Sequence, residues 1–258
     1  MLIACLALTA AAPLVSRDRP EAIDPSAALS GPSRGHWFGT DELGRDLLSR
    51  LLYGGRASLA LASASVAVSV LVGVPSGLFA GYYGGAWDGA IMRVADFLLA
   101  FPAVLLAIIF VTFLGPGLLS AMIAIGVARF PVFCRLSRAS IVATRSREFV
   151  EAARGIGCRD ARVVVRHLLP NAMDPLVVQT ALTFGQAILT GAALGFLGLG
   201  AQPPTPEWGT MVGRGRLYLQ SAAYVSLFPG LAIAVVAVAA NVLGDALRDM
   251  LDPRLRHG

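Results

Sequence analysis

The sequence predicts an all-α polytopic membrane protein with about six transmembrane helices. Its 258 residues are 56% hydrophobic and only 14% charged, with a mean hydropathy of +0.69. A soluble domain needs more charged side chains on its surface. Several apolar runs reach the roughly 20 residues that a helix needs to cross a hydrocarbon core of about 30 Å. They do not alternate as the short strands of a β-barrel do.

The first apolar run, Met1–Val15, is short for a span and allows two interpretations. One is the hydrophobic region of a signal peptide, since residues 10–12 are small, but no positively charged region precedes it. We favour the other, a first transmembrane helix in residues 1–16 whose cytoplasmic start lies upstream of Met1. An even number of spans also requires an anchor here.

Residues 17–56 are polar and predict an external loop. They contain six arginines and six acidic residues, so their net charge is near zero. Leucines that share one helical face predict a short amphipathic helix at Asp41–Tyr53, and Thr40 can cap its start.

Residues 57–258 form the main transmembrane domain, with five expected spans. These cover the remaining apolar runs, about Ala57–Ala80, Ile91–Leu114, Leu118–Ser137, Asp174–Leu199 and Val225–Leu243. Pro102 predicts a kink in the second of them. Asp174 followed by Pro175 predicts a capped helix start. Gly200–Tyr224 is rich in proline and glycine and predicts a loop.

The segment Glu148–Asn171 is rich in arginine and lies between apolar runs. We expect a helix at Arg147–Ile156, capped by Ser146 and ended by Gly157 in a conformation with positive φ. A second helix, about Asp160–Leu168, leads into the next span. A cationic, partly helical insert of this kind indicates a docking surface on the cytoplasmic face.

The distribution of arginine predicts the orientation. Residues 129–166 carry nine arginines, and the tail 248–258 carries three. The positive-inside rule places both in the cytoplasm. Residues 17–56 are then external although they hold six arginines, which conflicts with the rule. The balanced charge of this loop reduces the conflict without removing it.

Several chemistries are excluded by composition. All 21 basic residues are arginine. A Walker A motif and a pyridoxal enzyme each need a lysine, so any ATP that drives this protein is bound by another chain. The three histidines and three cysteines show no metal-ligand spacing, and no G-x-S-x-G motif is present. We therefore expect no catalytic residues, no cofactor and no metal on this chain.

The spacing within the arginine-rich segment resembles the EAA loop of ABC-importer permeases. Glu151, Ala152 and Ala153 are followed after three residues by Gly157, and nine further residues precede His167, which stands two before Leu169-Pro170. The resemblance implies that residues of about 145–171 form the loop that couples the permease to its ATPase. Glu151 would offer a carboxylate, and the two alanines would allow close approach. The implied coupling residues are Glu151, Ala152, Ala153, Gly157, His167, Leu169 and Pro170.

The resemblance covers nearly the whole chain. It is carried by Gly39–Asp46, Ser49–Arg50, Gly55–Leu59, Phe101–Pro102, Phe196–Gly200, Gln202–Gly209 and Gly244–Arg254. These motifs resemble the second, or C-type, permease of the dipeptide, oligopeptide, glutathione and nickel importers.

Membership of that family implies a type I ABC-importer permease fold in the bacterial cytoplasmic (inner) membrane. It also implies a homologous second permease, two cytoplasmic ABC ATPases that bind the ATP, and an external substrate-binding protein. The substrate would be peptide-like, and no nucleic acid is involved. Nickel or glutathione import remains an alternative within the family. An ion-gradient-driven transporter would need carboxylates at mid-membrane, which the spans lack.

Three polar residues of the spans are candidates for lining the pathway. Arg129 departs from the family's usual small or apolar residue, and an intramembrane charge usually faces a cavity. Its side chain could instead extend to the cytoplasmic interface. Gln179 and Gln186 are seven residues apart and share one helical face.

Other polar residues of the spans have structural interpretations. Arg93 and Asp96 are three residues apart and are expected to pair. Asn241 and Asp245, at the end of the last span, are expected to pack against a neighbouring helix or to cap.

Overall fold

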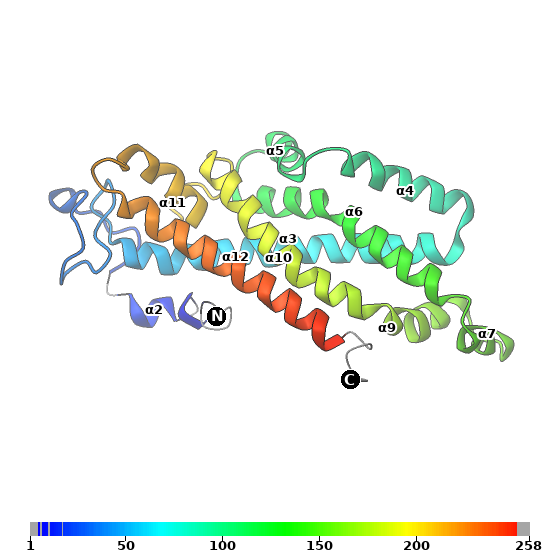
Figure 1. The fold of residues 1–258 in the computed structure, drawn as a ribbon. Coiled ribbons are helices and arrows are strands. Elements are labelled where there is room, and N and C mark those ends of the chain that lie inside the picture. Colours follow the sequence, from blue (N-terminus) through cyan, green and yellow to red (C-terminus); the bar gives the residue numbers. More distant parts are fainter. Residues whose placement is uncertain (1–4, 6, 10, 17, 252–258) are drawn as a thin grey trace.

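The structure is a computed structural model that describes residues 5, 7–9, 11–16 and 18–251. Figure 1 shows an elongated helical bundle, with α3 (Leu47–Tyr83) along its whole length and three other long helices beside it. These are α6 (Leu118–Thr144), α10 (Met173–Phe196) and α12 (Tyr224–Leu251). All four are long and apolar enough to cross a membrane. The predicted all-α polytopic membrane fold is confirmed.

The two ends of the bundle differ. One end, called the loop end below, holds residues 18–46 and α11 (Trp208–Gly215) (Figure 1). The opposite end, called the α7 end, holds α7 (Glu148–Gly155). Any site at one end is therefore separated from a site at the other by the length of the long helices.

Helix α3 corrects the prediction of a separate amphipathic helix at Asp41–Tyr53. The chain turns at residues 41–46, and α3 begins at Leu47 because Asp46, not Thr40, caps it: Asp46 Oδ2 accepts a hydrogen bond of 2.8 Å from Ser49 N. The helix then continues without a break into the predicted span Ala57–Ala80. Small residues at positions 54 and 55 lie inside the helix, where a Cβ on Gly55 would come within 2.7 Å of Trp208 Cζ2.

The core lies mainly between α3 and α6, where serine and glycine let the backbones come close. Ser69 Oγ donates to Gly126 O at 2.9 Å, and Ser137 Oγ donates to Val74 O at 3.1 Å. Hydroxyl groups that bond to the facing backbone hold helices together where lipid supplies no hydrophobic force. Large apolar side chains point outward instead, including Leu71 at 73% and Phe113 at 85% exposure. Such faces are suited to lipid or to a membrane partner.

The predicted span Ile91–Leu114 is broken. Its two parts are α4 (Gly85–Leu99) and α5 (Ala103–Leu114), which meet at 96°. The break falls at Pro102, as predicted, but it is a corner rather than a kink. Proline has no N–H to continue the ladder of α4, and Pro102 O instead accepts from Leu106 N to start α5. Counted as one span, the pair gives five spans in the described residues.

Three other helix boundaries differ from the predictions. Helix α6 extends beyond Ser137 to Thr144, and α12 extends to Leu251. Helix α10 begins at Met173 with Ala172 as its N-cap, so the predicted cap by Asp174 is wrong; Asp174 lies in the first turn.

The predicted loop Gly200–Tyr224 contains two elements that the sequence did not indicate, α11 and the 3-10 turn η3 (Arg216–Tyr218).

The termini are described only in part. The predicted first span, residues 1–16, lies partly outside the described residues; a short helix, α2 (Ala12–Val15), is seen there. Residues 252–258 of the predicted tail also lie outside them. Between these limits, the short turn η1 (Pro25–Ala27) is the remaining element at the loop end of the described chain.

Candidate functional site

Helix α7 is the predicted docking helix, one residue shorter than expected at each end. Arg147 is its N-cap, so the predicted cap by Ser146 is wrong, and no side chain caps the helix. Glu148 and Glu151 lie in the first turn and Arg154 in the last. This order places each charge where the helix dipole favours it.

The end of α7 is a Schellman motif built on Gly157. Gly157 has φ of +81°, as predicted. Its N–H donates to Arg154 O at 2.9 Å, and Cys158 N donates to Ala153 O at 3.1 Å. A residue with a Cβ is strained at this φ, whereas glycine is not. The motif fixes the direction in which the chain leaves α7.

The second predicted helix continues further than Leu168. It consists of α8 (Asp160–Arg162), the π-helical turn η2 (Val163–Leu168) and α9 (Leu169–Asn171). Pro170 lies in the first turn of α9, where its missing N–H is tolerated. His167 is half-buried, and its backbone oxygen accepts a hydrogen bond of 2.7 Å from Asn171 Nδ2.

A small apolar core of its own lies beneath α7. Val150 and Ala153, three residues apart, point into it and are 0% and 5% exposed. The core also contains Tyr82, Ile141, Val163, Leu168 and Ala172. Ala153 therefore packs against its own chain, which corrects the expectation that both alanines form a docking surface. Glu151 and Ala152 are exposed, and so is Ile156 at 82%. Sequence reasoning missed Ile156, although an apolar residue just before Gly157 was a signal for it.

The docking segment is fastened to the last turn of α3. Tyr82 Oη donates to Asp160 Oδ1 at 2.6 Å, and the guanidinium of Arg154 lies 5.3 Å from the centre of the Tyr82 ring. Arg145 Nη1 donates to Gly81 O at 2.9 Å. These contacts join α7 and the segment after it to the last turn of α3. These pairings could not be predicted from the sequence, because their partners are more than 60 residues apart.

Two of the three predicted pathway residues meet. Arg129 Nη1 on α6 donates to Gln186 Oε1 on α10 at 2.6 Å. Arg129 Nε is buried and has no hydrogen-bond partner in the described part of the chain. Gln179 is apart from this pair, since its Nε2 donates to Thr183 Oγ1 at 3.1 Å. The hydrogen bond to Gln186 thus ties the side chain of Arg129 to α10.

The predicted pairing of Arg93 with Asp96 is wrong. Asp96 pairs with Arg135 of α6, and Asp88 pairs with Arg138 of α6 at 2.5 Å. Both acidic residues of α4 thus pair with arginines of the neighbouring helix and not within α4. Gln179 of α10 and Arg135 of α6 line one shallow surface depression.

The expected packing role of Asn241 agrees with its position. A Cβ on Gly185 of α10 would lie 3.3 Å from Asn241 Oδ1, so the amide is against the neighbouring helix. Asp245 is exposed.

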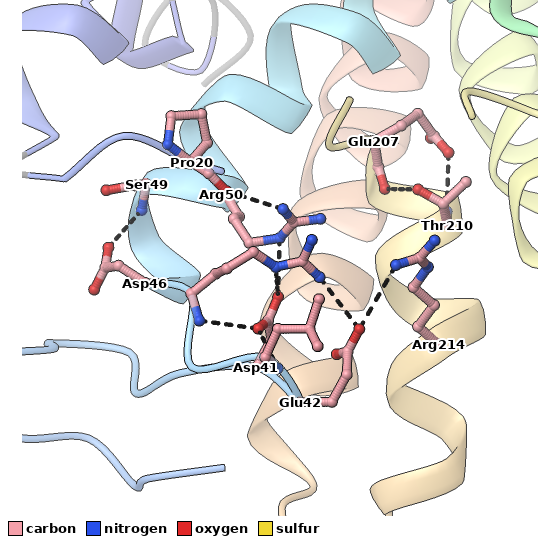
Figure 2. A network of polar contacts seen from close by, with 11 residues as sticks. Pro20, Asp41, Glu42, Asp46, Ser49, Arg50, Glu207, Thr210 and Arg214 are labelled. Atoms are coloured by element: carbon pink, nitrogen blue, oxygen red, sulfur yellow. Dashed lines mark hydrogen bonds and ion pairs between the residues drawn. The ribbon is translucent and has the colours of Figure 1, made fainter. Parts of the chain in front are cut away.

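A second polar cluster lies at the loop end, and Figure 2 shows it from close by. Arg45 Nε bonds to Asp41 Oδ2 at 2.7 Å, and Arg50 Nε lies 3.2 Å from the same oxygen. Arg45 Nη2 bonds to Glu42 Oε1 at 3.2 Å, and Arg214 Nη1 of α11 lies 3.7 Å from that oxygen. Two arginines of the predicted external loop are thus buried and paired. They are not free charges, which removes part of the conflict with the positive-inside rule.

Glu207 anchors α11 to α3. It is 1% exposed, and its carboxylate accepts from Ser58 Oγ at 2.9 Å, Gly209 N at 2.8 Å and Thr210 N at 2.9 Å. Burial raises the pKa of Glu207, while the three hydrogen bonds oppose that shift. Trp208 Nε1 also donates to Leu51 O at 2.8 Å. This cap was not predicted from the sequence, because glutamate is not a usual N-cap residue.

Three side chains of types that bind metal ions come together nearby. Their spacing in the sequence did not indicate this. Single atoms of Asp18, His36 and Asp46 lie within 4.8 Å of one another. Asp46 already caps α3, and its Oδ1 is 3.1 Å from His36 Nδ1. The grouping is explained as a turn that holds the start of α3.

The family model described as "Binding-protein-dependent transport system inner membrane component" matches residues 73–257. Among relatives, a dipeptide transport system permease protein of Alkalihalophilus pseudofirmus is 45% identical over 95% of this chain and 81% of that protein. A di/tripeptide transport system permease protein of Pseudomonas aeruginosa is 46% identical over 91% of this chain and 78% of that protein. A glutathione transport system permease protein of Shigella flexneri is 48% identical over 88% and 75%.

Two solved structures share the fold. The MetNI methionine ABC transporter, in an inward-facing conformation, matches with a TM-score of 0.62 at 20% identity, over 78% of this chain and 96% of that chain. An amino acid ABC transporter with histidines matches with a TM-score of 0.56 at 16% identity, over 80% and 94%.

Proposed function

Because this chain belongs to the family of binding-protein-dependent transport system inner membrane components, we propose that it forms half of the pathway of an ATP-driven peptide importer. Family and fold place it as a multi-pass permease of the inner membrane. Dipeptide and di/tripeptide permeases are among its relatives, which supports a peptide substrate. The glutathione permease among them keeps glutathione, itself a peptide, as the second candidate.

The observation that carries this proposal is the way α7 packs: one face lies on a small core of the same chain, and the opposite face is exposed. The helix presents Glu151, Ala152 and Ile156 outward, while Val150 and Ala153 seat it on its own core. The bond from Tyr82 to Asp160 joins that core to α3. An ATPase bound to the outer face can therefore push on a long helix of the pathway. Transport follows if the ATPases and the binding protein favour different states of the permease.

Three kinds of partner protein are part of the proposal. Two ATPases would bind ATP, since this chain has no lysine for a phosphate-binding loop. They would contact the α7 end, which we assign to the cytoplasm from its arginines. A homologous permease would cover exposed apolar faces such as that around Phe113 of α5. An external binding protein would deliver substrate at the loop end. The chain itself would carry out no bond chemistry.

The proposal is tested by uptake into proteoliposomes that contain the complete importer. The binding protein and a labelled dipeptide are supplied outside, and ATP is enclosed inside. We expect uptake that requires ATP and is unchanged by a protonophore. Uptake driven by a proton or sodium gradient without ATP would overturn the proposal in favour of a secondary transporter. Parallel assays with glutathione and Ni²⁺ decide the substrate.

A further inference from the structure

A cavity lined by arginines lies at the loop end, and none of the functions described above involves it. It has a volume of about 260 Å³ and lies between the end of α10, the 201–205 loop and α11. Three arginines line it, Arg50, Arg214 and Arg216, and no acidic residue of the described chain is among the lining residues. A cleft lined by positive charge attracts anions.

The charges around the cavity do not balance. Asp41 and Glu42 supply two carboxylates, and these are shared among Arg45, Arg50 and Arg214. Arg216 makes no ion pair within the described residues; its guanidinium lies 4.9 Å from the centre of the Phe196 ring. The carboxylate of Glu207 is buried behind the wall, where it already accepts three hydrogen bonds. The cavity therefore has more guanidinium groups than carboxylates to neutralise them.

Arg50 gives the cavity a buried charged side chain that is fixed in place by its own hydrogen bonds. Its side chain is 5% exposed, Nη1 donates to Pro20 O at 2.9 Å, and Nε faces Asp41. Nη2 makes no hydrogen bond or ion pair with the described residues, although the side chain lines the cavity. Figure 2 shows the guanidinium groups of Arg50 and Arg214 approaching the same space from α3 and α11. A buried arginine with a free N–H edge is suited to an oxyanion.

We propose that this cavity binds the carboxylate group of a small molecule. Planar guanidinium groups match a carboxylate, with which they form paired hydrogen bonds. The volume is below the roughly 300–1,000 Å³ of sites for drug-sized ligands, so the occupant is about the size of an amino acid or dipeptide. The assignment to the C-terminal carboxylate of a peptide rests on the proposed function. The carboxylate-binding cavity itself does not.

The test measures binding directly, with no transport step. The complete importer in nanodiscs, without ATP and without binding protein, is titrated with acetate, Ala-Ala and Ala-Ala amide by saturation-transfer NMR. We expect saturable binding of acetate and Ala-Ala, and at least about tenfold weaker binding of the amide. Arg214→Gln and Arg216→Gln should each weaken Ala-Ala binding by about tenfold or more. Arg34→Gln, which removes an exposed arginine at the same end, is the matched control and should change nothing.

Several outcomes would overturn the proposal. These are the absence of saturable carboxylate binding, equal binding of the amide, or equal effects of all three variants. If the variants weaken only the attachment of the binding protein, the cations recognise a protein surface and the proposal is wrong. Gel filtration of each variant importer shows whether assembly is retained, and Arg216→Lys keeps the charge should Arg216→Gln not assemble. Failure of ATP-driven uptake would refute the proposed function and leave the cavity result standing.

Discussion

Tyr82, on the last turn of α3, donates a hydrogen bond of 2.6 Å to the carboxylate of Asp160, which opens the helical segment after α7. The two residues are 78 positions apart, yet this bond joins the longest helix to the docking segment.

Tyr82→Phe should uncouple ATP hydrolysis from transport. The ring remains in its apolar core, so the loss is one hydrogen bond worth about 1 kcal/mol, too little to unfold the chain. The measurement is peptide imported per ATP hydrolysed in proteoliposomes, which should fall while hydrolysis continues. Tyr83→Phe is the control, because Tyr83 is exposed and should leave the ratio unchanged. An unchanged ratio in Tyr82→Phe would show that the bond carries no force.

Ala153→Asp and Ala152→Asp should fail in different ways. The first places a carboxylate in the small core beneath α7, at a cost of about 3–5 kcal/mol if it stays charged. The second adds a charge to the exposed face only. We expect Ala153→Asp to lower the yield of folded permease, and Ala152→Asp to fold normally but to lose the ATPases on co-purification. Equal yields for both would contradict the burial of Ala153.

Gly157→Val should misdirect the chain after α7. A Cβ at this position meets no atom within 4 Å, so the penalty comes from φ of +81° and amounts to about 1–3 kcal/mol. Gly157→Asn is the matched variant, since asparagine tolerates this region better. Stimulated ATP hydrolysis should fall strongly in the valine variant and weakly in the asparagine variant. Equal activity in the two would remove the role of the Schellman motif.

Glu207→Gln should loosen α11 from α3. All three partners donate to the carboxylate, whereas an amide presents an N–H₂ group to one of them. One unmade bond at this buried site costs about 1–3 kcal/mol. Thermal unfolding of the purified importer should show a lower midpoint at pH 7, and Glu207→Ala should be at least as severe. A midpoint equal to that of the unchanged protein would show that the carboxylate is not needed.

The same residue predicts a pH dependence. Burial raises the pKa of Glu207 above the ordinary pKa of a glutamate, which the unfolded chain keeps, so between the two pKa values the folded protein binds more protons than the unfolded chain. The free energy of unfolding contributed by Glu207 therefore falls as pH rises through that window. Glu207→Gln should flatten this part of the stability profile. A profile that keeps its slope would assign the slope to other groups.

Cysteine labelling tests the orientation. In a variant without Cys5, Cys134 and Cys158, a single cysteine at position 154 should react with an impermeant reagent only from the cytoplasmic side. A cysteine at position 34 should react only from outside. Labelling of position 154 in intact cells would reverse the orientation and with it the assignment of the two ends.

The sequence predicted the helices that long apolar runs define, and it failed where short side-chain contacts decide the boundary. The break in the helix at Pro102 and the end of α7 at Gly157 were predictable, because proline and glycine each restrict or free the backbone at their own position. The helix at Asp41–Tyr53 was placed too early, since Asp41 bonds to the backbone of Leu43 and Arg45 and keeps the chain in a turn. Helix α11 was missed because its cap is a glutamate buried by contacts from α3.

In the candidate site, too, some features were predictable from the sequence and others depend on contacts between distant residues. The positions of Glu151 and Gly157 followed from spacing, and the meeting of Arg129 with Gln186 joined two residues that were singled out separately. The burial of Ala153 beside the exposed Ala152 could not be read from spacing, because it depends on which face of α7 meets Val163 and Leu168. The coupling and pathway roles of these residues stay predictions.

The length of α3 has a mechanical consequence. Its 37 residues, at about 1.5 Å each, extend roughly 55 Å, well beyond the hydrocarbon thickness of about 30 Å. Arg50 lies in its first turn and Tyr82 in its last, so one continuous lever joins the cationic cavity to the docking segment. A tilt of about 5° about one end would displace the other by roughly 5 Å. A modest movement imposed at Tyr82 would thus reach the cavity around Arg50 through one helix, in which Pro75 is the only internal proline.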